Sequence, residues 1–398
     1  MECVLNAKHP MIKMLNTVGL FISAVLVSTF IFAAEPAAPA ALNRIMTNIG
    51  STMIDTYPII VMQRPLTADE KRLLRTNIKR LSELFDSAEP YIRARSETYF
   101  ISYRFILDYL RETQRAIDDK NLDYARTRLY GLGAICASCH TQDTKLRTLF
   151  AGAGRERFPS DIAYAEFNFL TRNYDMAEKY FERDLRSAAV KTEYDIIRPL
   201  QRLIVIYTQI KNQPGAGADL LSKFVDLPAH TELTRQELKG WIAGLRVLES
   251  RGADKVAAPA FAEIEARVRD ILGPLNQPLP VIRVTADQEI QRLWLSGVLY
   301  HYLNRKPLSD EVPKLLYWLA VNDRVVGYSY YFSLADLYLK ECVYSHTQHP
   351  YAQRCYAEFQ EYVNFAYSGS GGTFIPPELK QEMRNMQAAI NQASMKKQ

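Results

Sequence analysis

The sequence has little net charge, few cysteines and, after its first 34 residues, no long apolar run. Its 398 residues carry a formal net charge of +5, and Lys and Arg are interspersed with Asp and Glu. The absence of a basic run argues against a nucleic-acid partner. With 48% hydrophobic and 23% charged residues, the composition is that of a globular protein, and the length predicts two or three domains.

Catalytic signatures are also missing. The sequence contains no Ser/His/Asp arrangement, no glycine-rich phosphate loop and no metalloprotease motif. We therefore predict that the protein is not an enzyme.

The N-terminal segment has the organisation of an export signal. Lys8 and Lys13 precede an apolar stretch from Met14 to Ala34, and an Ala/Pro segment follows. A basic region, an apolar core and small residues predict a secretory signal peptide at residues 1–34. The stretch is also about as long as the roughly 20 residues of a transmembrane helix, so a retained inner-membrane anchor stays open. Both alternatives predict a periplasmic protein.

Four amphipathic helices are predicted between residues 41 and 152. Thr67 and Glu70 form a capping-box pattern, in which the two side chains satisfy backbone N–H groups at a helix start. Pro58 is expected to end the first helix, and Pro90 is expected to end the helix that begins at the capping box. Four helices joined by short loops indicate an antiparallel four-helix bundle and an all-α fold. The other three predicted helices span 42–56, 91–117 and 122–136.

From residue 155 to 272 the pattern resembles tetratricopeptide repeats. Ala165 and Ala177 lie where two helices of such a repeat approach closely, and Tyr174 and Phe181 lie where aromatics fill the groove between them. The match covers one repeat, residues 161–185, so an unrelated helical domain is the open alternative. Further helices are predicted near 193–211, 216–225 and 233–249.

The last predicted region, 282–398, follows a Pro-rich linker at 273–280. We interpret its many aromatic residues as helical core, with a partner-binding groove as the alternative. A Ser/Gly loop is expected at 368–372. Helices are predicted near 286–304, 309–321, 328–345, 350–366 and 377–393.

Cys136-Ala-Ser-Cys139-His140 matches C-x-x-C-H, the attachment pattern of c-type haem. On a helix Cys136 and Cys139 lie one turn apart on one face, so both thiols can add to the vinyl groups at one edge of the porphyrin. His140 is the predicted axial ligand of the iron. A thioredoxin-like pair would need a βαβ context and a zinc site a second ligand pair. One motif predicts one covalently attached haem c.

A C-x-x-C-H motif on the last helix of a four-helix bundle resembles the cytochrome c-prime family and its low-spin relatives, over about residues 40–150. In the low-spin members a Met on the first helix is the second axial ligand, often followed four residues later by Gly and then by another Met. Met46, Gly50 and Met53 have this spacing. The resemblance therefore implies Met46 as the candidate second ligand, with Met53 or an open site as alternatives.

Other positions depart from the family pattern. Members often carry an Arg four residues after the haem His and another four residues before the Met. Thr144 and Leu42 stand at these positions, with Lys145, Arg147 and Arg44 nearby, so propionate pairing stays open. The remaining histidines outside the targeting segment are predicted to be surface or core residues, namely His230, His301, His346 and His349.

Cys342 and Cys355 flank the connection between two predicted helices. In an oxidising compartment two such cysteines usually pair, and we predict a disulfide. Free thiols, or a zinc site formed with His346 and His349, are the alternatives.

Together these patterns predict an exported mono-haem cytochrome that transfers electrons and docks an unidentified redox partner protein through its helical region. Two alternatives remain. One is a c-prime-like module that binds nitric oxide or carbon monoxide at an open iron, and the other is a haem-bearing scaffold of a periplasmic complex.

Overall fold

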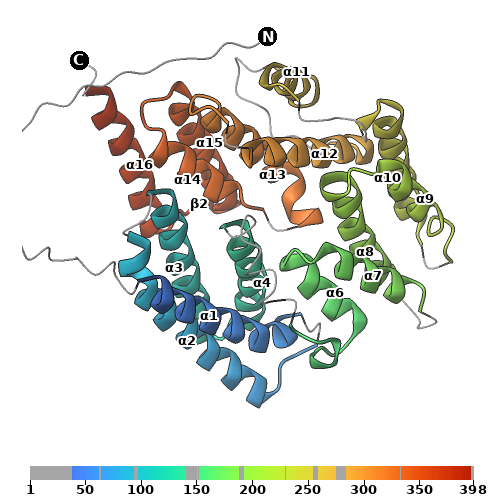
Figure 1. The fold of residues 1–398 in the computed structure, drawn as a ribbon, viewed down its shortest axis with the longest axis horizontal. Helices are drawn as coiled ribbons and strands as arrows, with labels where there is room; N and C mark the ends of the chain where they lie inside the picture. The colour runs from blue at the N-terminus through green and yellow to red at the C-terminus, as the bar shows by residue number, and fades with distance from the viewer. Residues whose placement is uncertain are drawn as a thin grey trace, which may run out of the picture.

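The computed structural model confirms the all-α prediction for the residues that it describes (Figure 1). The predicted signal or anchor at 1–34 lies outside these residues, as does His140. Within the described ranges, no helix is both long and apolar enough to cross a membrane. The structure describes residues 38–61, 64–93, 97–139, 150, 152–187, 192–228, 230–253, 259–274, 284–305, 307–331 and 333–395.

The first four helices pack in chain order, and α1 also packs against α4. Because the connections between them are short, consecutive helices run antiparallel. A buried hydrogen bond joins the first two, from Asn77 Nδ2 in α2 to Thr56 Oγ1 in α1 at 3.0 Å. The four helices are α1 Ala38–Ile60, α2 Ala68–Arg93, α3 Glu97–Asp118 and α4 Leu122–Cys139.

The predicted capping box at the start of α2 is confirmed, whereas both proline boundaries are wrong. Thr67 N donates to Glu70 Oε2 at 2.8 Å, and Glu70 N donates to Thr67 Oγ1 at 3.2 Å. Pro58 lies inside α1 and Pro90 inside α2. Each proline stands in the last turn of its helix, where it removes a single hydrogen bond. Burial of Ile60 and other residues of those turns keeps the turns helical.

The middle of the chain is a series of helix pairs. The short helix η1 (Arg155–Arg157) leads into a hairpin of α6 (Asp161–Leu170) and α7 (Tyr174–Leu185), in which Ala165, Ala177 and Phe181 are fully buried. Helix α8 continues into the π-helical segment η2. The remaining elements are α8 Glu193–Val205, η2 Ile206–Ile210, α9 Pro214–Ser222, α10 Glu232–Ser250 and α11 Phe261–Leu272.

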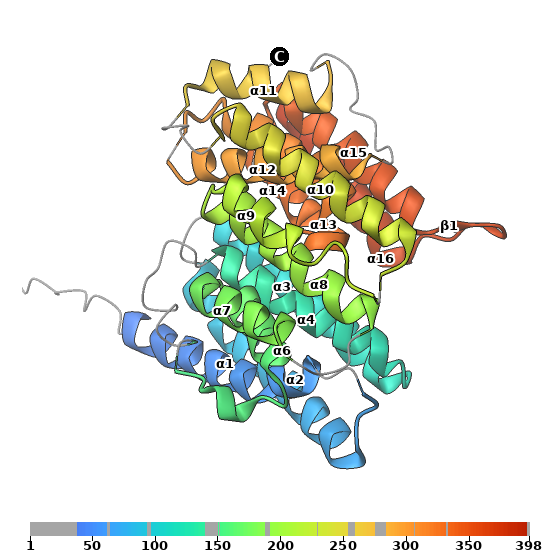
Figure 2. The same cartoon turned by 90° about the vertical axis from the view of Figure 1, so that its right-hand side faces the viewer.

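The last region differs from the prediction in two places. Residues 312–330 form one helix, α13, where separate helices at 309–321 and 328–345 were expected. The expected loop at 368–372 contains a two-stranded hairpin that projects from the body of the molecule (Figure 2). The elements are α12 Ala286–Leu303, α13 Val312–Tyr330, α14 Ala335–Ser345, α15 Pro350–Ala366, β1 Ser368–Gly369, β2 Gly372–Thr373 and α16 Pro377–Met395.

Two hydrophobic clusters hold these helices together. The first extends from α1 through α10 and takes in parts of α12 and α13, so it is continuous across the boundary predicted near residue 152. The second joins α11 to the helices from α12 to α16. Helix α14 also packs against α3, which brings the C-terminal region back to the first four helices (Figure 1).

Candidate functional site

The predicted haem-attachment motif lies at the end of α4. Cys136 and Cys139 are in its last turn, three residues and about 4.5 Å of helical rise apart. Leu129, Leu132 and Gly133 precede the motif on α4 and are buried, and the two leucines belong to the first hydrophobic cluster. His140 and the basic residues at 145 and 147 lie outside the described residues.

Two contacts join α4 to α1 and to the segment that follows α1. Arg126 Nη1 donates to the carbonyl oxygen of Arg64 at 3.1 Å. Seven residues further along α4, Gly133 lies against the ring of Tyr57, so closely that a Cβ on the glycine would overlap the tyrosine hydroxyl. Arg64 follows α1 and Tyr57 lies in the last turn of α1, so α4 runs antiparallel to α1, and the Gly133–Tyr57 contact sets their register. Continuing the same register brings the level of Cys139 to about that of Ser51.

One face of α1 is turned toward α4 at this level. Met46, Gly50, Met53 and Tyr57 are spaced by four, three and four residues, which places them on one side of a helix. Tyr57 shows that this side faces α4. Met53 is 1% exposed, Gly50 is buried and Met46 is half-buried against the first cluster. In this register the C-x-x-C turn is level with residues 51–54 of α1, so Met53 lies within that level and Met46 lies five residues beyond it, toward the start of α1.

A buried ionic cluster that was not predicted from the sequence joins α4 to α6 and α8. Glu166 of α6 accepts from Arg198 Nε at 2.8 Å and from Arg202 Nε at 3.3 Å, both on α8, and it also accepts from the hydroxyl of Tyr130 on α4. Arg202 donates further to the backbone oxygen of Tyr330. Burial alone would raise the pKa of Glu166, but the two arginines hold it below its usual value. Burial likewise raises the pKa of Tyr130.

A signal for this cluster is present in the sequence. Glu166 is the one charged residue between Ile162 and Leu170 of α6, and Arg202 directly precedes the apolar residues that end α8. A charged residue within a buried stripe needs a partner of opposite charge. Which partner it has depends on how α6 and α8 pack, and that packing could not be read from the sequence.

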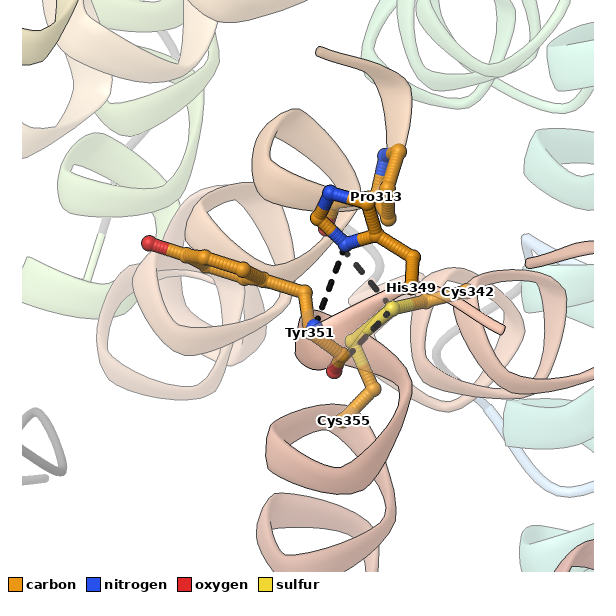
Figure 3. Close-up of a disulfide and its surroundings, with 5 residues drawn as sticks. All are labelled: Pro313, Cys342, His349, Tyr351 and Cys355. Atoms are coloured by element: carbon orange, nitrogen blue, oxygen red, sulfur yellow. Dashed lines mark hydrogen bonds between the residues drawn. A yellow bond between two sulfur atoms is a disulfide. The ribbon is translucent and has the colours of Figure 1, made fainter. Parts of the chain in front are cut away.

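The second cysteine pair forms a disulfide between Cys342 of α14 and Cys355 of α15, with a Cα–Cα distance of 6.3 Å (Figure 3). Both residues are fully buried. His349 accepts from Tyr351 N through Nδ1 at 3.1 Å and contacts Asp310 through Nε2 at 3.0 Å. The zinc alternative is therefore wrong for this structure, because both sulfur atoms are bonded to each other and His349 is occupied.

The other predicted positions are dispersed. Leu42 and Arg44 lie on the first turns of α1, with Arg44 exposed. His230 precedes α10, His301 lies on α12 and His346 follows α14, so none of them lies in the α1–α4 pair. Among the described residues, no group of three or more His, Cys, Asp or Glu side chains could hold a metal ion.

Comparison of this chain with protein-family models, with curated proteins and with solved structures gives no match.

Proposed function

We propose that the protein is an exported mono-haem c-type cytochrome that transfers electrons. The observation that carries the proposal is the C-x-x-C turn at the end of α4, level with the face of α1 that bears Met46 and Met53. The motif supplies two thiols one turn apart and a following His140 in the sequence. These are the groups that c-type haem requires.

The residues on the facing side of α1 suit a haem in their chemistry. A thioether from Met46 or Met53 can serve as the second axial ligand. When bound, a haem with His and Met ligands exchanges one electron and has no open coordination position. In this proposal the Gly133–Tyr57 contact holds α1, which bears the methionines, in register with α4, which carries Cys136 and Cys139.

The disulfide between Cys342 and Cys355 supports the export part of the proposal. Disulfides persist in oxidising compartments such as the bacterial periplasm and are rare in the cytosol. The basic and apolar N-terminal segment points to the same compartment.

We propose that the helices from α6 onward dock the redox partner. The α6–α7 hairpin has the buried small residues of a tetratricopeptide-like unit, Ala165 and Ala177, and such units build extended concave binding surfaces.

The visible spectrum of the exported, purified full chain tests the proposal. We expect one covalent haem per chain that resists extraction with acidified acetone, and its loss in the Cys136→Ala/Cys139→Ala variant. A full chain that folds without haem after expression with a haem-attachment system would overturn the proposal.

Methionine variants test the second ligand. We expect Met46→Ala to change a six-coordinate low-spin spectrum, while Met176→Ala, another half-buried methionine of the first cluster on α7, leaves it unchanged. A change in Met53→Ala alone would assign the ligand to Met53. If neither substitution alters the spectrum, methionine ligation is rejected, and carbon monoxide binding by the reduced parent then favours the gas-binding alternative.

A further inference from the structure

A cavity of about 270 Å³ opens where the end of α1, the start of α6 and the side of α8 meet. One part of its wall is apolar and is formed by Val61, Pro159, Ile162 and Ala163. Its remaining wall includes Glu166 and Arg198, two charged residues of the buried ionic cluster. The cavity is separate from the C-x-x-C turn, because Val61 follows the opposite end of α1 from Met46.

Positive charge is in excess at the polar wall. Glu166 is a single carboxylate, 4% exposed, shared between the guanidinium groups of Arg198 and Arg202. Arg202 is fully engaged inside the protein, with Glu166, Tyr130 and the oxygen of Tyr330. Arg198 is 25% exposed and lines the cavity. A partly buried guanidinium that shares one carboxylate with a second guanidinium is stabilised by a further anion.

The other cation of the cavity is already neutralised. Arg64 forms a two-pronged ion pair with Glu70, with N–O distances of 2.9 and 2.6 Å. This pair holds the pKa of Glu70 down to about 2. The surplus charge is therefore located at Arg198, opposite the apolar wall.

We infer that this cavity binds a small organic monocarboxylate. Arginine recognises a carboxylate through two parallel hydrogen bonds, and the apolar wall would cover a short hydrocarbon chain or one ring. The volume lies slightly below the range of ligand sites, about 300–1,000 Å³, which excludes nucleotides and larger cofactors. The one surplus guanidinium balances one carboxylate, so a second carboxylate on the ligand would bring an unpaired charge into the cavity. The inference is independent of haem attachment, because it uses none of the haem-site residues.

Isothermal titration calorimetry on the purified full chain tests the inference, with benzoate as the probe and neutral benzamide as its isosteric counterpart. We expect benzoate to bind with a Kd of about 1 mM, typical of a ligand this small, and at least tenfold more tightly than benzamide. Arg198→Gln should weaken benzoate binding at least tenfold. Arg246→Gln should leave it unchanged, because Arg246 pairs with Asp219 and Glu249 away from the cavity.

Because Arg198→Gln also breaks the ion pair with Glu166, a second variant tests the cavity without changing the ionic cluster. Val61→Trp fills the apolar wall and changes no charge, so it should also weaken benzoate binding at least tenfold. The inference is overturned if the parent shows no saturable binding of benzoate up to 20 times the expected Kd, if benzamide binds equally well, or if both variants bind like the parent. Binding of inorganic phosphate in preference to benzoate would overturn the carboxylate assignment.

Discussion

Gly133 sets how closely α4 can approach α1. Tyr57 is fully buried, and its ring occupies the space that any side chain at position 133 would need. The close approach keeps the methionine-bearing face of α1 against the helix that carries the cysteines. The absence of a side chain at Gly133 thus sets the spacing of the two helices three to six residues before Cys136 and Cys139.

We expect Gly133→Ala to lower the free energy of unfolding by about 2 kcal/mol, because the buried Tyr57 ring must move in a packed core. Urea unfolding of the purified protein measures the change. Gly369→Ala is the matched control, since a Cβ at that exposed glycine meets nothing within 4 Å. In a Tyr57→Phe background the penalty of Gly133→Ala should be smaller. Equal penalties in the two backgrounds would contradict the contact.

Asp323 of α13 is a second residue whose contribution can be measured, through the pH dependence of stability. It is 3% exposed, and burial raises its pKa to about 6, although hydrogen bonds from Tyr331 Oη and Leu334 N partly counter this rise. A carboxyl group whose pKa is higher in the folded state than in the unfolded state retains its proton in the native protein. Its contribution to stability is therefore lost as the pH rises from about 4 to 6.

We expect Asp323→Asn to remove that part of the pH dependence. When the pH rises from 4.5 to 7, the parent should lose about 2 kcal/mol of unfolding free energy that the variant does not lose. Urea titrations at the two pH values measure the difference. Asp219→Asn, at an exposed position, is the control and should show the same loss as the parent. A parallel pH dependence in parent and Asp323→Asn would show that the Asp323 carboxyl ionises normally.

Helix boundaries depend on local capping and on distant contacts to different degrees. The start of α2 is local, because Thr67 and Glu70 satisfy each other's backbone N–H groups. The continuity of α13 is not local. Asn322 in its middle donates to the backbone oxygen of Arg292 at 2.6 Å and to Ser296 Oγ at 2.7 Å, both on α12. These contacts stabilise a helix where the local sequence predicts a break.

We expect Thr67→Ala to destabilise α2 by about 1 kcal/mol, the usual cost of losing an N-cap side chain. Thermal or urea unfolding followed by circular dichroism measures the loss. Thr47→Ala is the control, because Thr47 is exposed and bonds only to the carbonyl of Asn43 within α1. A larger effect of Thr47→Ala than of Thr67→Ala would argue against the capping role.

At the scale of the whole molecule, the buried apolar residues form two hydrophobic clusters. The first contains the α1–α4 pair that bears the candidate haem site, and it extends without a gap into the α6–α10 helices. The second contains the disulfide, which links α14 and α15. Because α14 packs on α3, loosening the second cluster also weakens one support of the helices around the candidate site.

We expect Cys342→Ala/Cys355→Ala to lower stability by about 3 kcal/mol, since a cross-link of this separation, 13 residues, restricts the unfolded chain by about that amount. Urea unfolding of the double variant measures the loss. Addition of dithiothreitol to the parent should reproduce the effect, and dithiothreitol should leave the double variant unchanged. Equal stability of parent and double variant in oxidising buffer would contradict the prediction.

The sequence by itself determined the helical class, the capping box and the position of the C-x-x-C-H motif, because each depends on residues within a few positions of one another. It also predicted the pairing of Cys342 with Cys355, which lie on neighbouring helices. Only the tertiary structure decided the register of α1 against α4, since that depends on Gly133 meeting a tyrosine 76 positions earlier in the chain. The same holds for the sharing of Glu166 between two arginines, because α4, α6 and α8 must first pack together.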